Sequence, residues 1–444
     1  MSSELNSIKE LYEIFVQFPF VCTDTRKIVP NCLFFCLKGE HFDGNQFVNE
    51  ALEKGARCVI TEKREGRKKI FPFNLLKGCP KGGVVNKDSY IIVVDDVLKT
   101  LQQLAHYHRT QLKIPIIGIT GTNGKTTTKE LIATVLSKKY KTAYTQGNLN
   151  NHIGVPLTLL SIKEDDEIAV IEMGANHPGE IAELCAIALP DYGIITNIGK
   201  AHLEGFGSVE NIIETKTALY RAAKVLFINA EDKILSSYAL TLLRSYGLNY
   251  YGKNTDVSGS IVAMNPCLVI KLFDREIETQ LTGNYNLPNI LAAASIGRFF
   301  NVSTDAICQA ISEYSPQHQR SQIVKSESNT IIADYYNANP TSVLAALENF
   351  LQIEASHKWV ILGDMLELGE KTLSEHQLII DFCEQNKLKT CFIGENYYAL
   401  KNGRSGFFRN IDEFNNHQKS SAKLINTLVL IKGSRGIHLE NVII

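Results

Sequence analysis

The clearest pattern along the chain is an apolar run at Ile114–Ile119, followed by a loop rich in glycine and threonine and then by helical periodicity. The apolar side chains of the last part recur at the spacing of one helix face: Leu131, Ile132, Val135 and Leu136. The pattern therefore predicts a buried strand, a tight loop and an amphipathic helix between residues 114 and 136.

Apolar runs elsewhere divide the chain into three predicted α/β segments, and a length of 444 residues suits about three domains. In residues 1–95 the predicted elements are the strands Leu33–Leu37, Cys58–Ile60 and Ile91–Val94 and the helix Val48–Lys54. That helix stops at Gly55, a usual position for glycine. Residues 64–88 are polar and rich in glycine and lysine, which predicts a loop.

Residues 96–315 alternate between strand-like and helix-like stretches, which favours a mainly parallel sheet. The predicted elements include the strands Ile168–Ile171 and Tyr192–Thr196, a helix from Val209 and a helix over Ile290–Ile296. Residues 316–444 repeat the alternation, which predicts a doubly wound domain. Its predicted strands are Thr330–Ala333, Trp359–Leu362, Cys391–Ile393 and Thr427–Ile431. The predicted fold class is α/β, with domains at residues 1–95, 96–315 and 316–444.

One charged residue falls on an apolar helix face. In the helix that starts near Val209, Lys216 follows Ile212 by four residues and precedes Tyr220 by four, on the stripe that those two residues define. Lysine is rarely buried without a partner. On periodicity alone, the favoured interpretation is a lysine at the edge of the stripe whose ammonium reaches water, and burial is the alternative.

Composition narrows the class of protein. The 46 Lys and Arg residues against 47 Asp and Glu residues give a net charge of −1, so we expect neither a nucleic-acid nor an anionic-membrane partner. The ten cysteines are scattered without a Cys-x-x-Cys pair, which favours reduced thiols in a cytosolic protein. The N-terminus lacks the apolar core of a signal peptide, and no apolar run is long enough to span a bilayer. We therefore expect a cytoplasmic protein.

The loop after Ile119 has the residues of a phosphate-binding loop: Gly121, Thr122, Asn123, Gly124, Lys125, Thr126 and Thr127. Glycines let backbone N–H groups turn towards an anion, and the helix N-terminus adds a favourable dipole. In such a loop Lys125 reaches the terminal phosphates and the Thr126 hydroxyl binds Mg²⁺. The usual first glycine would fall at position 119, which is Ile. The alternative is a strand-to-helix turn that binds nothing.

Two further polar residues follow predicted strands of the same segment. Glu172 comes directly after Ile168–Ile171, and His202 lies in the loop after Tyr192–Thr196. Open α/β sheets bind ligands at the carboxyl ends of their strands. Each residue is a weak signal by itself, but both are possible metal ligands at the edge that holds the phosphate loop. The default chemistry is metal-assisted phosphoryl transfer from ATP.

The chain resembles the Mur ligases from Asp24 to Arg435. Its motifs occur in the order seen in that family: TGTNGKTTTKE, GNLNNHIGVP, EMGANHPGEI, TNIGKAHLEGFGS, GNYNLPN, DYYNANPTS, LGDMLELGE and LIKGSRG. The spacing GxxGxxGKT from Gly118 to Thr126 is also the one that this resemblance leads us to expect. Tyr336–Pro340 and Gly363–Gly369 most resemble the members that use D-alanyl-D-alanine.

The resemblance implies an N-terminal UDP-sugar-binding domain, a central ATPase and a C-terminal Rossmann-like domain. It implies that ATP phosphorylates the terminal carboxylate of UDP-N-acetylmuramoyl-tripeptide in peptidoglycan precursor synthesis. The amine of D-alanyl-D-alanine then attacks the acyl phosphate, and phosphate leaves as the amide forms. The implied partners are these small molecules and ATP with two Mg²⁺ ions, and we expect a monomer.

The resemblance also implies catalytic and metal-binding positions. Lys125 would stabilise the transferring phosphoryl group. Thr126 and Glu172 would hold one Mg²⁺, and His202 would help to hold a second. Lys216 falls where the family has a carbamylated lysine, whose anionic CO₂ adduct can bind a metal.

The remaining implied positions contact nucleotide or substrate. The ATP contacts are Asn289, Arg320 and, at the ribose, Asp334. The uridine-diphosphate and acceptor contacts are Thr25, Arg26, Asn148, Asn150, Asn151 and Asn337.

Two other functions stay open at this point. A sibling Mur ligase or a folylpolyglutamate-type ligase would add a single amino acid. A nucleotide-binding module without ligase activity would hydrolyse ATP only to drive a conformational change.

Overall fold

The computed structural model describes residues 2–40, 42–62, 89–242, 247–317, 319–326, 328–420 and 424–443. The predicted loop at residues 64–88 lies outside them. The chain forms two compact units. The first comprises Met1–Gly118, Tyr140–Gly174 and Glu180–Tyr192, and the second comprises Ile119–Lys139, Ala175–Gly179 and Gly193–Ile444.

The N-terminal part of the first unit is built on a four-stranded parallel sheet in the order β1-β2-β3-β4. Its strands are β1 (Val21–Cys22), β2 (Leu33–Phe35), β3 (Cys58–Glu62) and β4 (Tyr90–Val94). Its helices are α1 (Ser2–Gln17), η1 (Thr25–Lys27), η2 (Gly44–Phe47), α2 (Val48–Glu53) and α3 (Val97–Gln111). The predicted strands and α2 are confirmed, whereas α1 and β1 were not predicted.

A six-stranded sheet follows, in the order β10-β9-β8-β5-β7-β6. Its strands are β5 (Ile116–Thr120), β6 (Thr142–Tyr144), β7 (Ile168–Glu172), β8 (Tyr192–Ile195), β9 (Val225–Asn229) and β10 (Gly247–Tyr251). The pairs β6–β7 and β9–β10 are parallel, as the alternation predicted. Strand β5 is fully buried, and the helix predicted after it is α4 (Lys125–Leu136).

Helices connect the strands of this sheet. They are α5 (Gly154–Leu160), α6 (Glu180–Ala188), α7 (Leu203–Phe206), α8 (Val209–Ala222) and α9 (Lys233–Thr241). Further along the chain come η3 (Asn284–Asn286), α10 (Leu287–Phe299) and α11 (Thr304–Glu313). Helix α10 contains the predicted helix Ile290–Ile296 and packs on α4.

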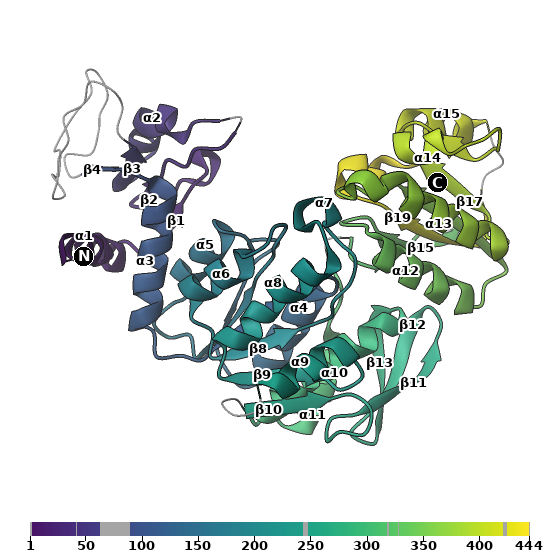
Figure 1. Cartoon of the computed structure of the whole chain (residues 1–444), viewed down its shortest axis with the longest axis horizontal. Helices are drawn as coiled ribbons and strands as arrows, with labels where there is room; N and C mark the ends of the chain where they lie inside the picture. The colour runs from purple at the N-terminus through teal and green to yellow at the C-terminus, as the bar shows by residue number, and fades with distance from the viewer. Residues whose placement is uncertain are drawn as a thin grey trace. The chain divides into compact units, whose positions relative to one another are not determined.

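Residues 259–282 depart from the predicted strand–helix alternation. They form an antiparallel sheet of β11 (Gly259–Met264), β12 (Cys267–Leu272) and β13 (Arg275–Thr282), labelled in Figure 1. Only Phe273 and Asp274 separate β12 from β13, and both have positive φ, the backbone of a tight hairpin turn. A connection this short permits only antiparallel pairing, because a parallel crossover needs a dozen or more residues.

The C-terminal part of the second unit contains a six-stranded sheet in the order β14-β15-β19-β16-β17-β18. Its strands are β14 (Gln322–Lys325), β15 (Asn329–Asp334), β16 (His357–Gly363), β17 (Thr390–Ile393), β18 (Phe407–Phe408) and β19 (Thr427–Lys432). Its helices are α12 (Pro340–Gln352), η4 (Gly369–Lys371), α13 (Thr372–Gln385), α14 (Glu395–Ala399), α15 (Ile411–Lys419), η5 (Arg435–Ile437) and η6 (Leu439–Asn441). Strand β14 is antiparallel to β15, and the other pairs are parallel.

Both faces of this sheet are covered, which confirms the predicted doubly wound arrangement. Along β16, Val360 and Leu362 belong to one apolar cluster, and Trp359 and Ile361 belong to another. Successive strand residues point to opposite faces, so each cluster covers one side of the sheet. The edge strands β14 and β18 were not predicted, because runs of four and two residues carry little periodic signal.

In the part of the chain that the structure describes, no helix is both long enough and apolar enough to cross a membrane.

Candidate active site

The phosphate-binding loop lies between β5 and α4 and has the backbone that such a loop needs. Gly124 caps α4 with a left-handed φ of 77°. A Cβ at this position would lie 2.9 Å from Oδ1 of Asn289, so only glycine fits without moving that side chain. Thr126, in the first turn of α4, is 2% exposed. The loop therefore presents backbone groups and a helix N-terminus, as the sequence predicted.

The ammonium group of Lys125 lies over the loop. Its Nζ donates to the carbonyl oxygens of Gly121 at 2.8 Å and of Thr122 at 3.0 Å. These two bonds hold the positive charge of Lys125 against the loop backbone. That position suits the predicted role of Lys125 in binding terminal phosphates.

The segment after β8 holds the phosphate loop in shape. The backbone N–H of Asn123 donates to Oδ1 of Asn197 at 3.0 Å, and Nδ2 of Asn197 donates back to the carbonyl oxygen of Asn123 at 2.9 Å. The Thr196 hydroxyl donates to the same carbonyl at 2.6 Å. The backbone of Asn123 is thus held by the two residues that follow the neighbouring strand β8.

Lys216 lies inside the protein, so the favoured interpretation of a lysine at the edge of its stripe is wrong. It is 2% exposed, and its Nζ lies 5.8 Å from the centre of the Phe206 ring. Burial, and secondly the charge of Lys125, lower the pKa of Lys216 well below its usual value. Periodicity placed the residue on the apolar face correctly. The error lay in assuming that its ammonium would reach water. A lowered pKa favours the neutral amine, the form that reacts with CO₂.

His202 begins the short helix α7 with a left-handed φ of 50°. Its Nδ1 contacts Oε2 of Glu367, a residue of the loop after β16. The hydrogen bond from His202 lowers the pKa of the Glu367 carboxyl. The imidazole is therefore held on one side by a carboxylate.

Glu172 belongs to the first unit and is the last residue of β7. It is 1% exposed, and its Oε1 accepts a hydrogen bond from Nδ2 of Asn150 at 2.8 Å. The carbonyl of Asn150 also accepts from the N–H of Gly174 at 2.7 Å. The structure therefore joins a predicted substrate residue, Asn150, to a predicted metal ligand.

The residues predicted to contact nucleotide lie on separate elements of the second unit. Asn289, in α10, abuts Gly124, and its Nδ2 donates to Oδ1 of Asn286 at 2.9 Å. The guanidinium of Arg320 lies 3.8 Å from the centre of the Tyr336 ring. Asp334 forms an ion pair with Lys432 at 2.6 Å.

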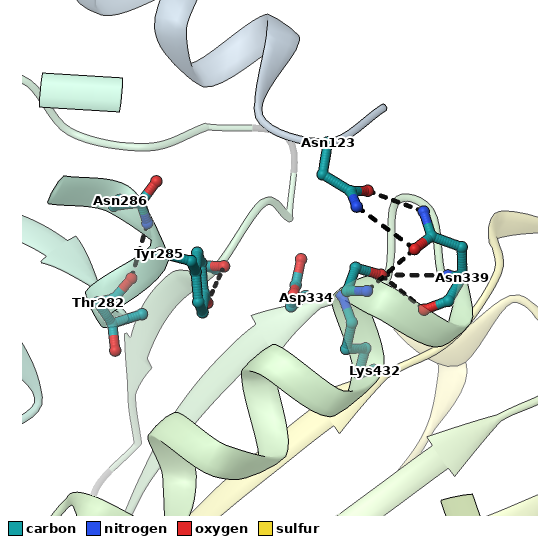
Figure 2. Close-up of polar contacts among 9 residues, drawn as sticks. Asn123, Thr282, Tyr285, Asn286, Asp334, Asn339 and Lys432 are labelled. Carbon is teal, nitrogen blue, oxygen red and sulfur yellow. Dashed lines mark hydrogen bonds and ion pairs between the residues drawn. The ribbon is translucent and has the colours of Figure 1, made fainter. Parts of the chain in front are cut away.

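A reciprocal amide pair connects the phosphate loop to α12, and Figure 2 shows the two side chains facing each other. Nδ2 of Asn339 donates to Oδ1 of Asn123 at 2.8 Å, and Nδ2 of Asn123 donates to Oδ1 of Asn339 at 3.4 Å. Asn339 also caps α12 through the N–H of Ser342. Asn337, the residue that the sequence singled out, lies exposed in the loop before α12.

The predicted substrate residues of the first unit lie in loops. Thr25 and Arg26 form η1, where Arg26 is paired with Asp24 at 2.8 Å. That pairing lowers the pKa of Asp24 to about 2. Asn148 is exposed, and Asn151 accepts the N–H of Gly154 at 2.9 Å at the start of α5.

The chemistry of the predicted ligands fits Mg²⁺ with a bound nucleotide. Among the described residues, no three His, Cys, Asp or Glu side chains form a metal-binding group. Mg²⁺ in phosphoryl-transfer sites takes one or two carboxylates and draws its other oxygens from phosphates and water. A hydroxyl such as that of Thr126 and a carboxylate such as that of Glu172 are oxygen ligands of this kind. Lys216 could act as a further metal ligand only after its positive charge is removed.

Sequence reasoning did not assign roles to Asn197, Asn339 or Glu367. All three lie within motifs that carry the family resemblance, so the signal was present at the level of the motif. Their roles depend on contacts between distant positions, such as the 216 residues that separate Asn123 from Asn339. No local pattern encodes such a contact.

Comparison with known proteins agrees with this geometry. Residues 17–109 match the Mur ligase family catalytic domain, residues 119–297 the Mur ligase middle domain, and residues 319–435 the Mur ligase glutamate ligase domain. The chain is 34% identical to the UDP-N-acetylmuramoyl-tripeptide–D-alanyl-D-alanine ligase of Bacillus subtilis (strain 168), over 95% of this chain and 92% of the relative. The chain belongs to the Mur ligase family.

Solved Mur ligases share the fold. MurF from Acinetobacter baumannii has a TM-score of 0.82 at 28% identity, covering 95% of this chain and 92% of that one. The MurF ligase of Thermotoga maritima, solved in complex with ADP, has a TM-score of 0.77 at 26% identity, covering 95% of each chain. The three-domain α/β architecture predicted from the sequence is that of these Mur ligases, with one antiparallel edge strand in the C-terminal sheet.

Proposed function

We propose that this protein is an ATP-dependent ligase that joins D-alanyl-D-alanine to UDP-N-acetylmuramoyl-tripeptide in peptidoglycan precursor synthesis. The observation that carries the proposal is the 34% identity, over nearly the whole chain, to a ligase of that name. The phosphate loop and the buried Lys216 support it, because both suit phosphoryl transfer from ATP. The products are the amide, ADP and phosphate.

Activation of a carboxylate explains why these residues are needed. A carboxylate is a poor electrophile until one of its oxygens becomes part of a phosphate leaving group. Two anions, the carboxylate and the γ-phosphate, must also meet, so positive charge has to screen them. Lys125 holds its ammonium over the loop carbonyls, where it can follow the transferring phosphoryl group. The dipeptide amine then attacks the acyl phosphate.

The proposed metal ligands are Thr126 and Glu172 for one Mg²⁺, and His202 with a carbamylated Lys216 for the second. Bound Mg²⁺ neutralises charge on the phosphates during transfer. Carbamylation replaces a buried ammonium by an anion and removes its repulsion with Lys125. Glu172 accepts a hydrogen bond from Asn150, and His202 contacts Glu367 in the loop after β16.

The remaining assignments follow the family resemblance. We assign nucleotide binding to Asn289, Arg320 and Asp334. We assign the UDP-sugar and acceptor contacts to Thr25, Arg26, Asn148, Asn150, Asn151 and Asn337. The proposed domains are residues 1–95, 96–315 and 316–444, in a cytoplasmic monomer.

The acceptor amine distinguishes this function from that of a sibling ligase. Purified enzyme is supplied with ATP, Mg²⁺ and UDP-N-acetylmuramoyl-tripeptide, and the product is identified by mass spectrometry. We expect a pentapeptide product with D-alanyl-D-alanine and none with single amino acids or with glutamate. A product with a single amino acid, and none with the dipeptide, would assign the chain to another branch of the family.

A further inference from the structure

The loop between β16 and α13 approaches the start of α7 closely. Gly369 has a left-handed φ of 56°, and a Cβ there would lie 3.3 Å from Cβ and 3.5 Å from Cα of Glu204. Two residues earlier in the same loop, Oε2 of Glu367 contacts Nδ1 of His202. Two separate points of this loop therefore meet the two ends of the segment His202–Glu204.

Contacts of the residues on both sides of Glu367 hold its loop in place. The N–H of Met365 donates to Nε2 of His376 at 3.0 Å, and the N–H of Leu366 donates to Oγ of Ser434 at 3.0 Å. Met365 and Leu368 are buried in the apolar cluster on one face of the C-terminal sheet. Glu367, between these anchors, has a left-handed φ of 64°, and its side chain is partly exposed.

Neighbouring contacts dock the same C-terminal segment onto the residues before His202. Nζ of Lys200 lies 3.4 Å from Oε1 of Glu375, in the first turn of α13. The N–H of Lys200 donates to Oγ1 of Thr341 at 3.3 Å. The approach of Glu367 to His202 is thus one of several contacts and is not an isolated surface pair.

We propose that Glu367 is a positioning residue for His202. A carboxylate can only accept, so an imidazole nitrogen in contact with it, here Nδ1, must carry a proton. The other ring nitrogen, Nε2, then keeps its lone pair for a cation in the neutral ring. In metal-binding histidines generally, a carboxylate or carbonyl that accepts from the other ring nitrogen fixes the tautomer and orientation of the ring. The proposal rests on the proposed function, because it takes His202 to be a metal ligand.

Orientation of the ring, more than stability, is the consequence of this contact. The Glu367 side chain is 55% exposed, so water competes for its carboxylate and the contact adds little to the stability of the fold. Glu367 belongs to the C-terminal segment and His202 to the segment after β8. Contact between these two segments therefore orients the His202 ring for metal binding. A chain lacking this contact would keep its fold and lose the ring orientation.

The tautomer of His202 can be measured in the metal-free enzyme. Long-range ¹H–¹⁵N correlation of histidine-labelled protein, with the His202 signal assigned by its loss in His202→Gln, reports which nitrogen is protonated. We expect the Nδ1–H form in the wild type and a shift to the Nε2–H form in Glu367→Ala. Glu367→Gln keeps the size of the side chain and is expected to shift in the same direction by less. Glu370→Ala removes a neighbouring exposed carboxylate of the same loop and is expected to match the wild type.

Binding of Mn²⁺ gives a second readout. In the presence of a non-hydrolysable ATP analogue, electron paramagnetic resonance is expected to show about 10–100-fold weaker Mn²⁺ binding in Glu367→Ala and no change in Glu370→Ala. An Nε2–H tautomer in the wild type, or equal Mn²⁺ affinity in Glu367→Ala and the wild type, would overturn the proposal. The tautomer is read without metal or substrate, so failure of the ligase function would show separately as a wild-type enzyme that forms no product.

Discussion

At the scale of single residues, Lys216 carries the most information. A buried ammonium close to a second lysine is costly unless it loses its charge. The sequence predicted that this residue lies on the apolar face of α8, and the structure adds that its amine does not reach water. The proposed conversion to a carbamate would account for both its burial and its proposed role as a ligand.

Replacement of Lys216 by alanine tests that role. We expect ligation by Lys216→Ala to fall at least about a hundredfold, the upper end of the effect of losing a metal-supporting group. Short carboxylic acids should restore part of it, because a carboxylate in the vacated space mimics the carbamate. Initial rates with and without added acetate measure this. Lys224→Ala, at an exposed lysine just after α8, serves as the control. A fully active Lys216→Ala enzyme would refute the assignment.

The same residue predicts how stability depends on pH in ligand-free protein without CO₂. The pKa of Lys216 in the folded state lies below its unfolded value of 10.5, so the unfolded chain binds more protons between these two values. Burial of Lys216 therefore lowers the free energy of unfolding. The loss is complete below the folded pKa and disappears as the pH rises to 10.5. Lys216→Met should therefore melt higher than the wild type at neutral pH, by about 2–4 °C per kcal/mol relieved. Thermal scans from pH 7 to pH 10 should show the gap closing. A difference in melting temperature between the two proteins that widens with pH would contradict the burial of an ionisable Lys216.

At the scale of elements, the predictable parts are those with a strong local pattern. Strand β5 and helix α4 could be placed because an apolar run, a glycine loop and helical periodicity follow one another. The antiparallel sheet β11–β13 was not predicted. In its β12–β13 hairpin, Phe273 and Asp274 form the turn without the usual glycine. The amide pair of Asn123 and Asn339 could not be predicted, because it depends on how α12 meets the phosphate loop.

The cap of α12 gives a prediction at this scale. Asn339→Ala removes the side chain that caps the helix and also its hydrogen bonds to Asn123. We expect a loss of about 1 kcal/mol in the free energy of unfolding and a several-fold rise in the KM for ATP. Asn410→Ala removes an equivalent cap from α15, whose Asn410 accepts the N–H of Glu413. It should cost similar stability and leave the KM unchanged. Equal KM values in the two variants would show that the contact between Asn339 and the phosphate loop does not contribute to ATP binding.

At the scale of the whole molecule, the proposed residues come from both compact units. Glu172 and Asn150 belong to the first unit, and Lys125, His202 and Lys216 belong to the second. Acyl phosphates react with water, so the proposed function predicts that bound substrate is shielded from solvent. The radius of gyration from small-angle scattering should therefore decrease when an ATP analogue and UDP-N-acetylmuramoyl-tripeptide are added together. Identical scattering curves with and without both ligands would argue against closure.

The most direct test of the ligase function is phosphate release from ATP when each acceptor is omitted in turn. The reaction couples ATP cleavage to two other substrates, so phosphate release above background should need both UDP-N-acetylmuramoyl-tripeptide and D-alanyl-D-alanine. Omission of either should reduce the rate to that of enzyme with ATP and Mg²⁺ alone. Phosphate release at the same rate whether or not the muramoyl substrate and the dipeptide are present would contradict the account.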